Sequence, residues 1–112
     1  MTTYKIRYLP TFKTDLEDAL DYITFNLQNP AAAKQLLKET EEAILKRLSV
    51  PLAFEPHYSK KERKNPYYRI RIKNYIVYYV VIEEVMEVRR FVYSRRNIEN
   101  LINEIEINEN LI

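Results

Sequence analysis

The chain lacks glycine and cysteine entirely, and it carries one histidine in 112 residues. Glycine-rich phosphate cradles, both the dinucleotide fingerprint and the P-loop, need glycine for tight turns and for close approach of the backbone to phosphate. The absence of cysteine excludes disulfides, zinc–thiolate sites and thiol nucleophiles. We therefore expect no cofactor and no metal, so lysine, arginine, tyrosine and carboxylates must supply any polar chemistry.

The single histidine, His57, lies between Pro56 and Tyr58. One histidine cannot form a two-histidine metal motif, and its turn-like flanks favour an ordinary loop residue over a catalytic one. No stretch approaches the length of a membrane span, and the alternating N-terminus lacks the apolar run of a signal peptide. With 46% hydrophobic residues, the chain is expected to form one cytoplasmic domain without membrane contact.

The net charge of +2 conceals a strong asymmetry along the chain. Residues 1–59 carry 7 basic and 8 acidic side chains, residues 60–96 carry 11 and 4, and residues 97–112 carry none and 4. The middle segment therefore holds the positive field. A basic patch of this density is typical of a surface that binds nucleic acid or an acidic protein, and its alternative interpretation is a solvated strand face.

Local signals in the first half predict a strand followed by a helical hairpin. Residues 4–9 alternate polar and apolar side chains and end at a proline, which indicates a short strand. The capping box that begins at Thr14 predicts a helix to about Leu27. Asn29 followed by Pro30 predicts the start of a second helix, which continues to about Leu48. The helical hairpin thus spans residues 14–48.

The second half reads as a loop over 49–65, three antiparallel strands over 67–93 and a helix over 95–105. Asn74 is expected to take the positive φ of the first hairpin turn, because asparagine tolerates it when glycine is missing. Ser94 is a candidate N-cap for the last helix. The predicted fold is α+β in the order β-α-α-β-β-β-α, a helical hairpin packed on a small, mostly antiparallel, twisted sheet.

Alternation in the first strand of this meander places Arg69, Arg71 and Lys73 on one face, together with Tyr67. The segment 67–96 carries seven basic side chains interleaved with tyrosines and aliphatic residues. Such a sheet offers a polyanion both charge and rings for stacking. Tyrosines on strands are nevertheless more often packing residues than ligand contacts.

The element order and two motifs resemble the RelE/ParE family of toxins from bacterial type II toxin–antitoxin modules. The stretch YYRIRIKNYIVYYVV is similar to the family pattern R-x-x-NY-x-x-x-Y, and VYSRRNIENLI is similar to its ending H/Y-x-RRD-x-x-x-L. The matched positions are Arg71, Asn74, Tyr75, Tyr79, Tyr93, Arg95, Arg96 and Asn97. Two of them depart from the family pattern, since Tyr93 stands where many members have histidine and Asn97 where many have aspartate.

The resemblance implies that a RelE-like member cuts messenger RNA on the ribosome through attack of a ribose 2′-OH on the adjacent phosphate. Such a reaction needs a base and charge stabilisation at the phosphorane. The implied catalytic residues are Arg69, Arg71, Lys73, Arg90, Tyr93 and Arg95, and the implied substrate-binding residues are Arg96, Lys60, Lys61 and Lys64. Lys73 is the candidate base, and it would need a strongly lowered pKa for that role. Glu87 is the carboxylate alternative, although its position favours an ion pair with Arg89 or Arg90 over a catalytic role.

A ParE-like member instead inhibits DNA gyrase through a protein contact and needs no catalytic residues. Under that interpretation Arg95 and Arg96 are contact residues. A third alternative is an inactive module that only binds a partner. The resemblance implies a cognate antitoxin as partner in all three cases, forming a hetero-oligomer with the toxin, and the sequence places RNA cleavage slightly ahead of gyrase inhibition.

Overall fold

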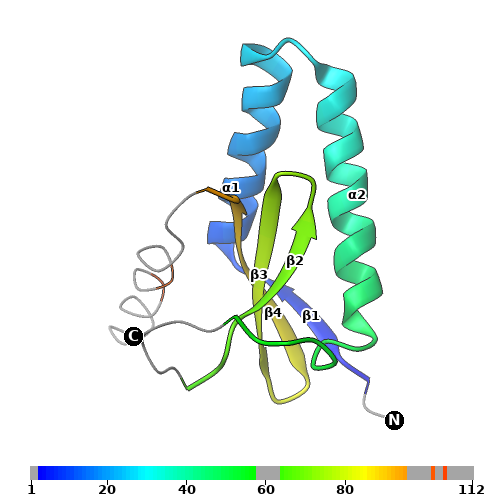
Figure 1. Cartoon of the computed structure of the whole chain (residues 1–112), viewed down its shortest axis with the longest axis vertical. Coiled ribbons are helices and arrows are strands. Elements are labelled where there is room, and N and C mark those ends of the chain that lie inside the picture. The colour runs from blue at the N-terminus through cyan, green and yellow to red at the C-terminus, as the bar shows by residue number, and fades with distance from the viewer. Residues whose placement is uncertain (1–2, 58–63, 96–101, 103–104, 106–112) are drawn as a thin grey trace.

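A four-stranded sheet with two helices on one of its faces forms the body of the molecule (Figure 1). The computed structural model describes residues 3–57 and 64–95, together with Ile102 and Ile105. The elements are β1 (Lys5–Tyr8), α1 (Pro10–Asp21), the π-helical turn η1 (Tyr22–Asn26), α2 (Pro30–Leu48), β2 (Tyr68–Ile72), β3 (Tyr75–Ile82) and β4 (Val85–Tyr93). The predicted α+β class and its helical hairpin on a mostly antiparallel sheet are confirmed.

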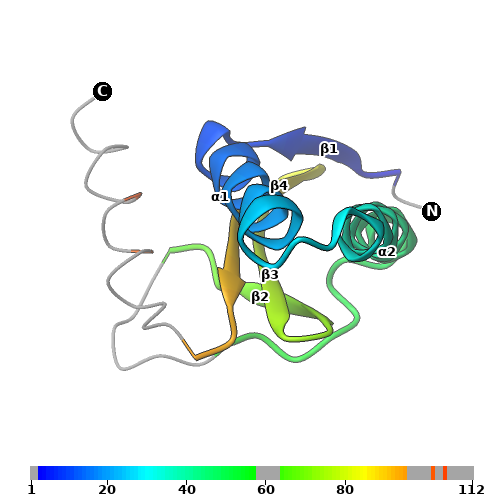
Figure 2. The same ribbon diagram turned by 90° about the horizontal axis from the view of Figure 1, so that it is seen from above.

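The strand order is β1-β4-β3-β2, so the first strand pairs with the last strand rather than with its sequence neighbour. β1 runs parallel to β4, and the other two pairings are antiparallel. The helical hairpin provides the crossover connection that parallel pairing of β1 with a later strand requires. Figure 2 shows both helices side by side on the same side of β2 and β3.

α1 begins at Pro10, four residues before the predicted start at Thr14, so the predicted capping box is wrong. Leu9 is the N-cap without any side-chain cap, and Pro10 occupies the first helical position, where its fixed φ suits the helix and its missing N–H is not needed. The Thr11 hydroxyl donates to the backbone oxygen of Arg89 at 2.8 Å. Tertiary contacts to β4 therefore fix the start of this helix.

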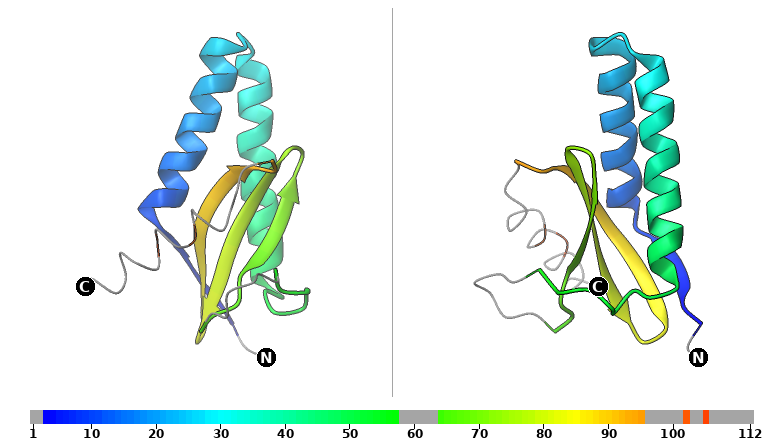
Figure 3. Two further views of the ribbon diagram at one scale, coloured as in Figure 1. Left: turned by 60° about the vertical axis from the view of Figure 1, so that its left-hand side comes forward. Right: turned by 45° about the vertical axis from the view of Figure 1, so that its right-hand side comes forward.

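α2 follows the sequence signals closely. The Asn29 side chain accepts a hydrogen bond from the amide of Ala32 at 3.1 Å, and Pro30 is the first helical residue, as predicted. The helix ends at Leu48, also as predicted. Figure 3 shows the hairpin running along one face of the sheet and projecting beyond the end at the β2–β3 turn.

Three residues take positive φ in a chain that has no glycine: Gln28 at 51°, Lys73 at 54° and Glu83 at 57°. Each of these side chains costs about 1 kcal/mol relative to glycine in the left-handed region. In the β2–β3 turn Lys73 takes the positive φ, so the prediction that Asn74 would take it is wrong. Positive φ at the first turn residue alone is the pattern of a type II′ turn, which fits the twist of a hairpin.

Apolar side chains fill both faces of the sheet. The face against the helices, called the helix face below, is packed by residues such as Phe12, Leu36 and Tyr79. The opposite face, called the outer face, holds a second cluster that includes Tyr67, Tyr78 and Ile102. Ile102 and Ile105 are helical and buried, whereas the rest of the predicted 95–105 helix lies outside the described residues and Arg95 belongs to a turn.

A β-bulge interrupts the pairing of β3 with β4. Tyr78 pairs with Arg90, but its neighbour Tyr79 pairs with Val88, so Arg89 is the extra residue. A bulge shifts side-chain alternation by one position. It returns Phe91 to the helix-face core and leaves two consecutive arginines, Arg89 and Arg90, at the point where the pairing changes.

Candidate functional site

Arg69 and Arg71, two residues of the predicted basic face, are exposed to solvent. Both side chains are exposed on the outer face of β2, while Tyr68, Ile70 and Ile72 of the same strand are buried against the helices. Neither guanidinium makes an ion pair with another residue that the structure describes. The alternation predicted for this strand thus holds for the two arginines.

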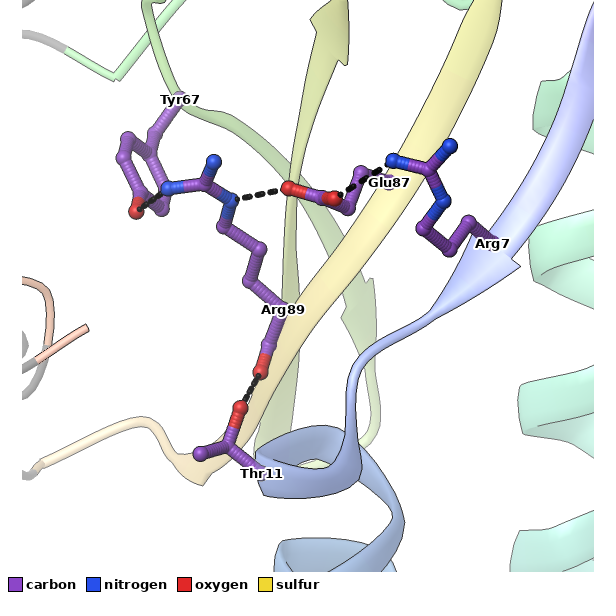
Figure 4. Close-up of polar contacts among 5 residues, drawn as sticks. All are labelled: Arg7, Thr11, Tyr67, Glu87 and Arg89. Atoms are coloured by element: carbon purple, nitrogen blue, oxygen red, sulfur yellow. Dashed lines mark hydrogen bonds and ion pairs between the residues drawn. The ribbon is translucent and has the colours of Figure 1, made fainter. Parts of the chain in front are cut away.

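Arg89 belongs to a buried network on the outer face rather than to a ligand surface (Figure 4). Its Nε donates to Glu87 at 2.8 Å and its Nη1 donates to the Tyr67 hydroxyl at 2.7 Å. Glu87 also accepts from the exposed Arg7 at 3.2 Å. The three inner residues, Tyr67, Glu87 and Arg89, are at most 6% exposed. Glu87 therefore satisfies buried charge, in line with the ion-pair interpretation of this carboxylate.

Arg90 forms the closest link between the sheet and α1. Its Nε and Nη2 donate to the two carboxylate oxygens of Asp15 at 2.7 and 2.8 Å, and the same carboxylate accepts from the amide of Phe91 at 3.0 Å. Beyond the end of β1, Thr11 and Asp15 thus take the hydrogen-bonding role of a neighbouring strand along β4. Because its side chain is only 10% exposed and two of its guanidinium nitrogens are bound by Asp15, Arg90 is not available to a ligand.

Lys73 does not share the face of Arg69 and Arg71, contrary to the alternation predicted for it. Its positive φ turns the chain at the end of β2, and its ammonium lies 3.4 Å from a carboxylate oxygen of Glu39 on α2. A hydrogen bond from Gln35 holds the pKa of Glu39 below its ordinary value, and Lys73 contributes to the same shift. Lys73 is therefore on the helix side of the sheet.

Tyr93 also lies on the helix side, beside a pocket of about 770 Å³ between the hairpin and the end of the sheet. The apolar lining of this helix-face pocket consists chiefly of Tyr22, Ile23, Leu27, Leu36, Tyr75, Phe91 and Tyr93. The Tyr75 ring stacks on Phe91 at 4.8 Å and meets the Tyr93 ring edge-on at 5.8 Å. Burial raises the pKa of the Tyr75 hydroxyl, and the neighbouring hydroxyls of Tyr93 and Tyr22 raise it further.

Sequence reasoning missed the contribution of α1 to this pocket. Asp15, Asp18 and Tyr22 line it from one side of the hairpin. Their spacing of three and four residues places them on one helix face, which is the signal that was available. Asp15 is neutralised by Arg90, whereas Asp18 has no ion pair within the described part of the chain.

The remaining predicted site residues are exposed or not described. Lys64 and Arg95 are exposed. Lys60, Lys61 and Arg96 lie outside the described residues. His57 pairs with Tyr67 through its backbone amide at 2.6 Å and packs edge-on against Tyr78. This packing agrees with the loop role expected for the histidine.

The loop after α2 is anchored by Arg47, which the sequence did not single out. Its guanidinium donates to the backbone oxygen of Arg69 and to the Tyr79 hydroxyl, both at 3.0 Å, and it covers the Phe54 ring at 3.5 Å. Tyr79 in turn donates to the Pro51 oxygen at 2.7 Å. Burial raises the pKa of Tyr79, and Arg47 partly offsets that rise. This cluster also covers part of the free edge of β2.

Within the described residues, no group of three or more histidines and carboxylates is placed to hold a metal ion. The helices described there include none that is long and apolar enough to cross a bilayer. The arrangement thus offers two surfaces: a pair of exposed arginines on the outer face, and an aromatic pocket on the helix face.

Comparison with known proteins identifies the fold. The family model for the ParE toxin of the type II toxin-antitoxin system parDE matches residues 6–98. A chain of the chromosomal ParDE system from P. aeruginosa is 12% identical with a TM-score of 0.68, covering 83% of this chain and 98% of that one. A chain of the E. coli DinJ-YafQ toxin-antitoxin complex is 10% identical with a TM-score of 0.55, covering 81% and 92%. No curated protein matches the sequence significantly.

Proposed function

The chain belongs to the ParE toxins of type II toxin–antitoxin systems, within the RelE/ParE family, and from this premise we propose that it arrests growth by binding DNA gyrase. The proposed contact is between proteins and involves no cleavage of RNA. The observation that carries this choice is the separation of the residues expected to cut RNA. Arg69 and Arg71 project from the outer face, whereas Tyr93 and Lys73 lie on the helix side.

Cleavage of RNA requires its participants around one phosphate. A base, a charge clamp and a group that orients the 2′-OH must all reach the same scissile bond at hydrogen-bond distance. Residues on opposite faces of a sheet cannot do so, since the sheet itself separates them. Arg90, which was expected to assist Arg69 and Arg71 in binding the phosphate, already donates hydrogen bonds from Nε and Nη2 to Asp15. A protein contact makes no such demand, because it uses a surface rather than a convergent site.

Ribosome-dependent cleavage of messenger RNA remains the second candidate because of Arg69 and Arg71 themselves. The two guanidiniums are exposed two residues apart on one strand, where they can contact successive phosphates of a single strand of RNA. Under this alternative the base must come from a residue other than Lys73.

A cognate antitoxin is the partner that family membership implies. The two structural neighbours are described as a ParDE toxin–antitoxin system and as the DinJ-YafQ toxin–antitoxin complex. We propose that this chain forms the corresponding complex with the product of an adjacent gene, in which the antitoxin covers the surface that the target would contact.

Induced expression tests the proposal directly. We expect growth arrest, relief of that arrest by the adjacent gene's product, and inhibition of gyrase supercoiling by the purified chain. Primer extension on messenger RNA from the same cells should show no new 5′ ends. New ribosome-dependent ends together with unimpaired supercoiling would replace the gyrase proposal by RNA cleavage. Absence of any arrest by a folded chain would support the inactive module.

Arg95→Ala tests the predicted contact residue. Arg95 is exposed in a turn next to the pocket residue Tyr93, so its loss should leave the fold intact and weaken growth arrest about tenfold or more in the dose required. Lys38→Ala, an exposed residue on α2, is the matched control for loss of one positive charge. Equal toxicity of Arg95→Ala and the control would remove Arg95 from the site.

A further inference from the structure

We infer that the helix-face pocket binds a small organic cation, whose alkylated ammonium group lies against tyrosine rings and pairs with the carboxylate of Asp18. Polyamines and quaternary ammonium compounds both carry this chemistry. The inference concerns the chain by itself, and it holds whether the target of the chain is gyrase or messenger RNA.

Tyrosine rings from three different elements line the pocket: Tyr22 from η1, Tyr75 from β3 and Tyr93 from the end of β4. Tyr22 is 52% exposed and Tyr93 is 41% exposed, so their rings are accessible to a ligand. The Tyr75 and Tyr93 rings meet at 67° with their centroids 5.8 Å apart, which forms a corner of two aromatic surfaces. Aromatic rings set at an angle to one another are the usual environment of a bound alkylammonium group.

The tyrosine hydroxyls also lie near one another. Burial, and after it the neighbouring hydroxyls of Tyr93 and Tyr22, raise the pKa of the Tyr75 hydroxyl. All three side chains therefore stay uncharged at neutral pH. They present π-systems and hydroxyl oxygens to a ligand without any positive charge that would repel a cation.

The apolar part of the pocket requires the cation to be organic. Ile23, Leu27 and Phe91 line the cavity beside the tyrosines, and an alkyl body loses contact with water against them. The volume of about 770 Å³ is in the range of pockets that hold small organic ligands. A metal ion needs several oxygen ligands, and among the described residues no group of three or more histidines and carboxylates could supply them.

The sign of the ligand's charge follows from which pocket charges are already neutralised. Three charged side chains line the pocket: Asp15, Asp18 and Lys73. Asp15 is held by Arg90 at 2.7 Å, and Lys73 lies 3.4 Å from Glu39. Asp18 is exposed and has no ion pair among the residues described. A cation therefore gains a carboxylate partner without breaking an existing ion pair, whereas an anion would have to compete with Glu39 for Lys73.

Isothermal titration calorimetry of the full chain with choline, spermidine and 3,3-dimethyl-1-butanol tests this inference. The last compound is the uncharged isostere of choline, so it measures the contribution of the apolar body alone. We expect at least one of the two cations to bind with a Kd below about 10 mM. Where choline binds, it should bind at least about fivefold more tightly than its isostere. Preference for choline assigns the quaternary ammonium class, and preference for spermidine assigns the polyamines.

Two substitutions with matched controls place the cation in the pocket. Asp18→Asn should weaken binding at least about fivefold, whereas Asp21→Asn should not, because Asp21 is also an exposed aspartate of α1 but does not line the pocket. Tyr22→Leu keeps an apolar side chain and removes the ring, so it should weaken cation binding by a similar factor. Phe25→Leu is its control, since Phe25 is an exposed ring of the same turn η1 outside the pocket.

Nuclear Overhauser effects between the ligand's methyl or methylene protons and tyrosine ring protons locate the bound cation on the parent chain without any substitution. Failure of both cations to bind would overturn the inference. Equal affinities for choline and its isostere, with no binding of spermidine, would do the same by showing an apolar pocket without charge recognition. Equal losses in Asp18→Asn and Asp21→Asn would replace the site by a general attraction to α1.

The proposed function has a separate readout. Growth arrest and gyrase inhibition involve no added cation, whereas the calorimetry uses neither gyrase nor RNA. A chain that fails to inhibit gyrase but binds the cation through Asp18 refutes the function and keeps the pocket assignment. The opposite pair of results refutes the pocket assignment alone. Circular dichroism melts of each variant show whether it is folded.

Discussion

Replacing Asp15 by alanine should strongly destabilise the protein. The carboxylate accepts two hydrogen bonds from Arg90 and one from the amide of Phe91, and the side chains of Asp15 and Arg90 are only 13% and 10% exposed. Removal leaves a buried guanidinium without a counterion, which costs about 3–5 kcal/mol. The orphaned amide adds to that cost unless water reaches it.

This loss is a large share of the total, since domains of this size unfold at about 5–15 kcal/mol. Urea unfolding followed by circular dichroism should show a lowered midpoint with an unchanged slope. Asp21→Ala on the same helix, an exposed position, should stay within about 0.5 kcal/mol of the parent. The double variant Asp15→Leu/Arg90→Met should recover most of the loss, because it removes both buried charges at once.

The result that refutes this reasoning is a cost below about 1 kcal/mol for Asp15→Ala, which is the value typical of a solvent-exposed ion pair. Arg90 would then have an alternative partner or access to water. A large cost that the double variant does not reduce would place the effect in the start of α1, where Asp15 lies, rather than in the ion pair. The double-mutant cycle separates these two origins.

Three further changes should shift stability in known directions. Thr40→Val should stabilise the fold by about 1 kcal/mol by urea unfolding, because the Thr40 hydroxyl is fully buried and has no hydrogen-bond partner among the described residues; a loss would mean that the hydroxyl is satisfied in solution. Gln28→Gly should raise the free energy of unfolding by about 0.5 kcal/mol, because φ is 51° at this position and glycine adopts a positive φ without steric cost. Destabilisation by this substitution would contradict that backbone geometry. Burial raises the pKa of Tyr8, Tyr75 and Tyr79 above the ordinary value of about 10. The contribution of these hydroxyls to the free energy of unfolding is therefore complete below about pH 10, and it is lost as the pH rises through their pKa values in the folded state. Thermal midpoints should therefore fall above about pH 10, and Tyr79→Phe should show a smaller fall than the parent; a flat profile would show that these hydroxyls are not desolvated.

The element order was predictable because each signal involved neighbouring residues. The asparagine cap and the proline at the start of α2 act within one helical turn, and the alternation in β2 reports a single strand. The start of α1 was not predictable in this way. Thr14 and Glu17 offered a local capping box, but contacts of Thr11 and Asp15 with β4, 78 and 75 residues away, outweighed it.

The faces of the basic residues depended on backbone features that the sequence hides. Strict alternation would have kept Lys73 with Arg69, yet a left-handed residue at the turn moved it toward Glu39. The bulge at Arg89 broke alternation in β4, and nothing in the stretch VMEVRRFVY distinguishes a bulged strand from a regular one. Pairing of Arg90 with the distant Asp15, and of Arg89 with Glu87 on the same strand, then kept both guanidiniums from the surface.

These displacements change what the charge asymmetry means for function. Positive charge in residues 60–96 suggested a polyanion surface, but Arg89 and Arg90 use their guanidiniums inside the fold, and Lys73 faces Glu39. Electrostatic attraction of RNA depends on the charge that remains at the surface, since a buried ion pair has almost no external field. The density of basic residues in the sequence therefore overstated the case for RNA. A protein target requires only that the surface be complementary in shape and charge.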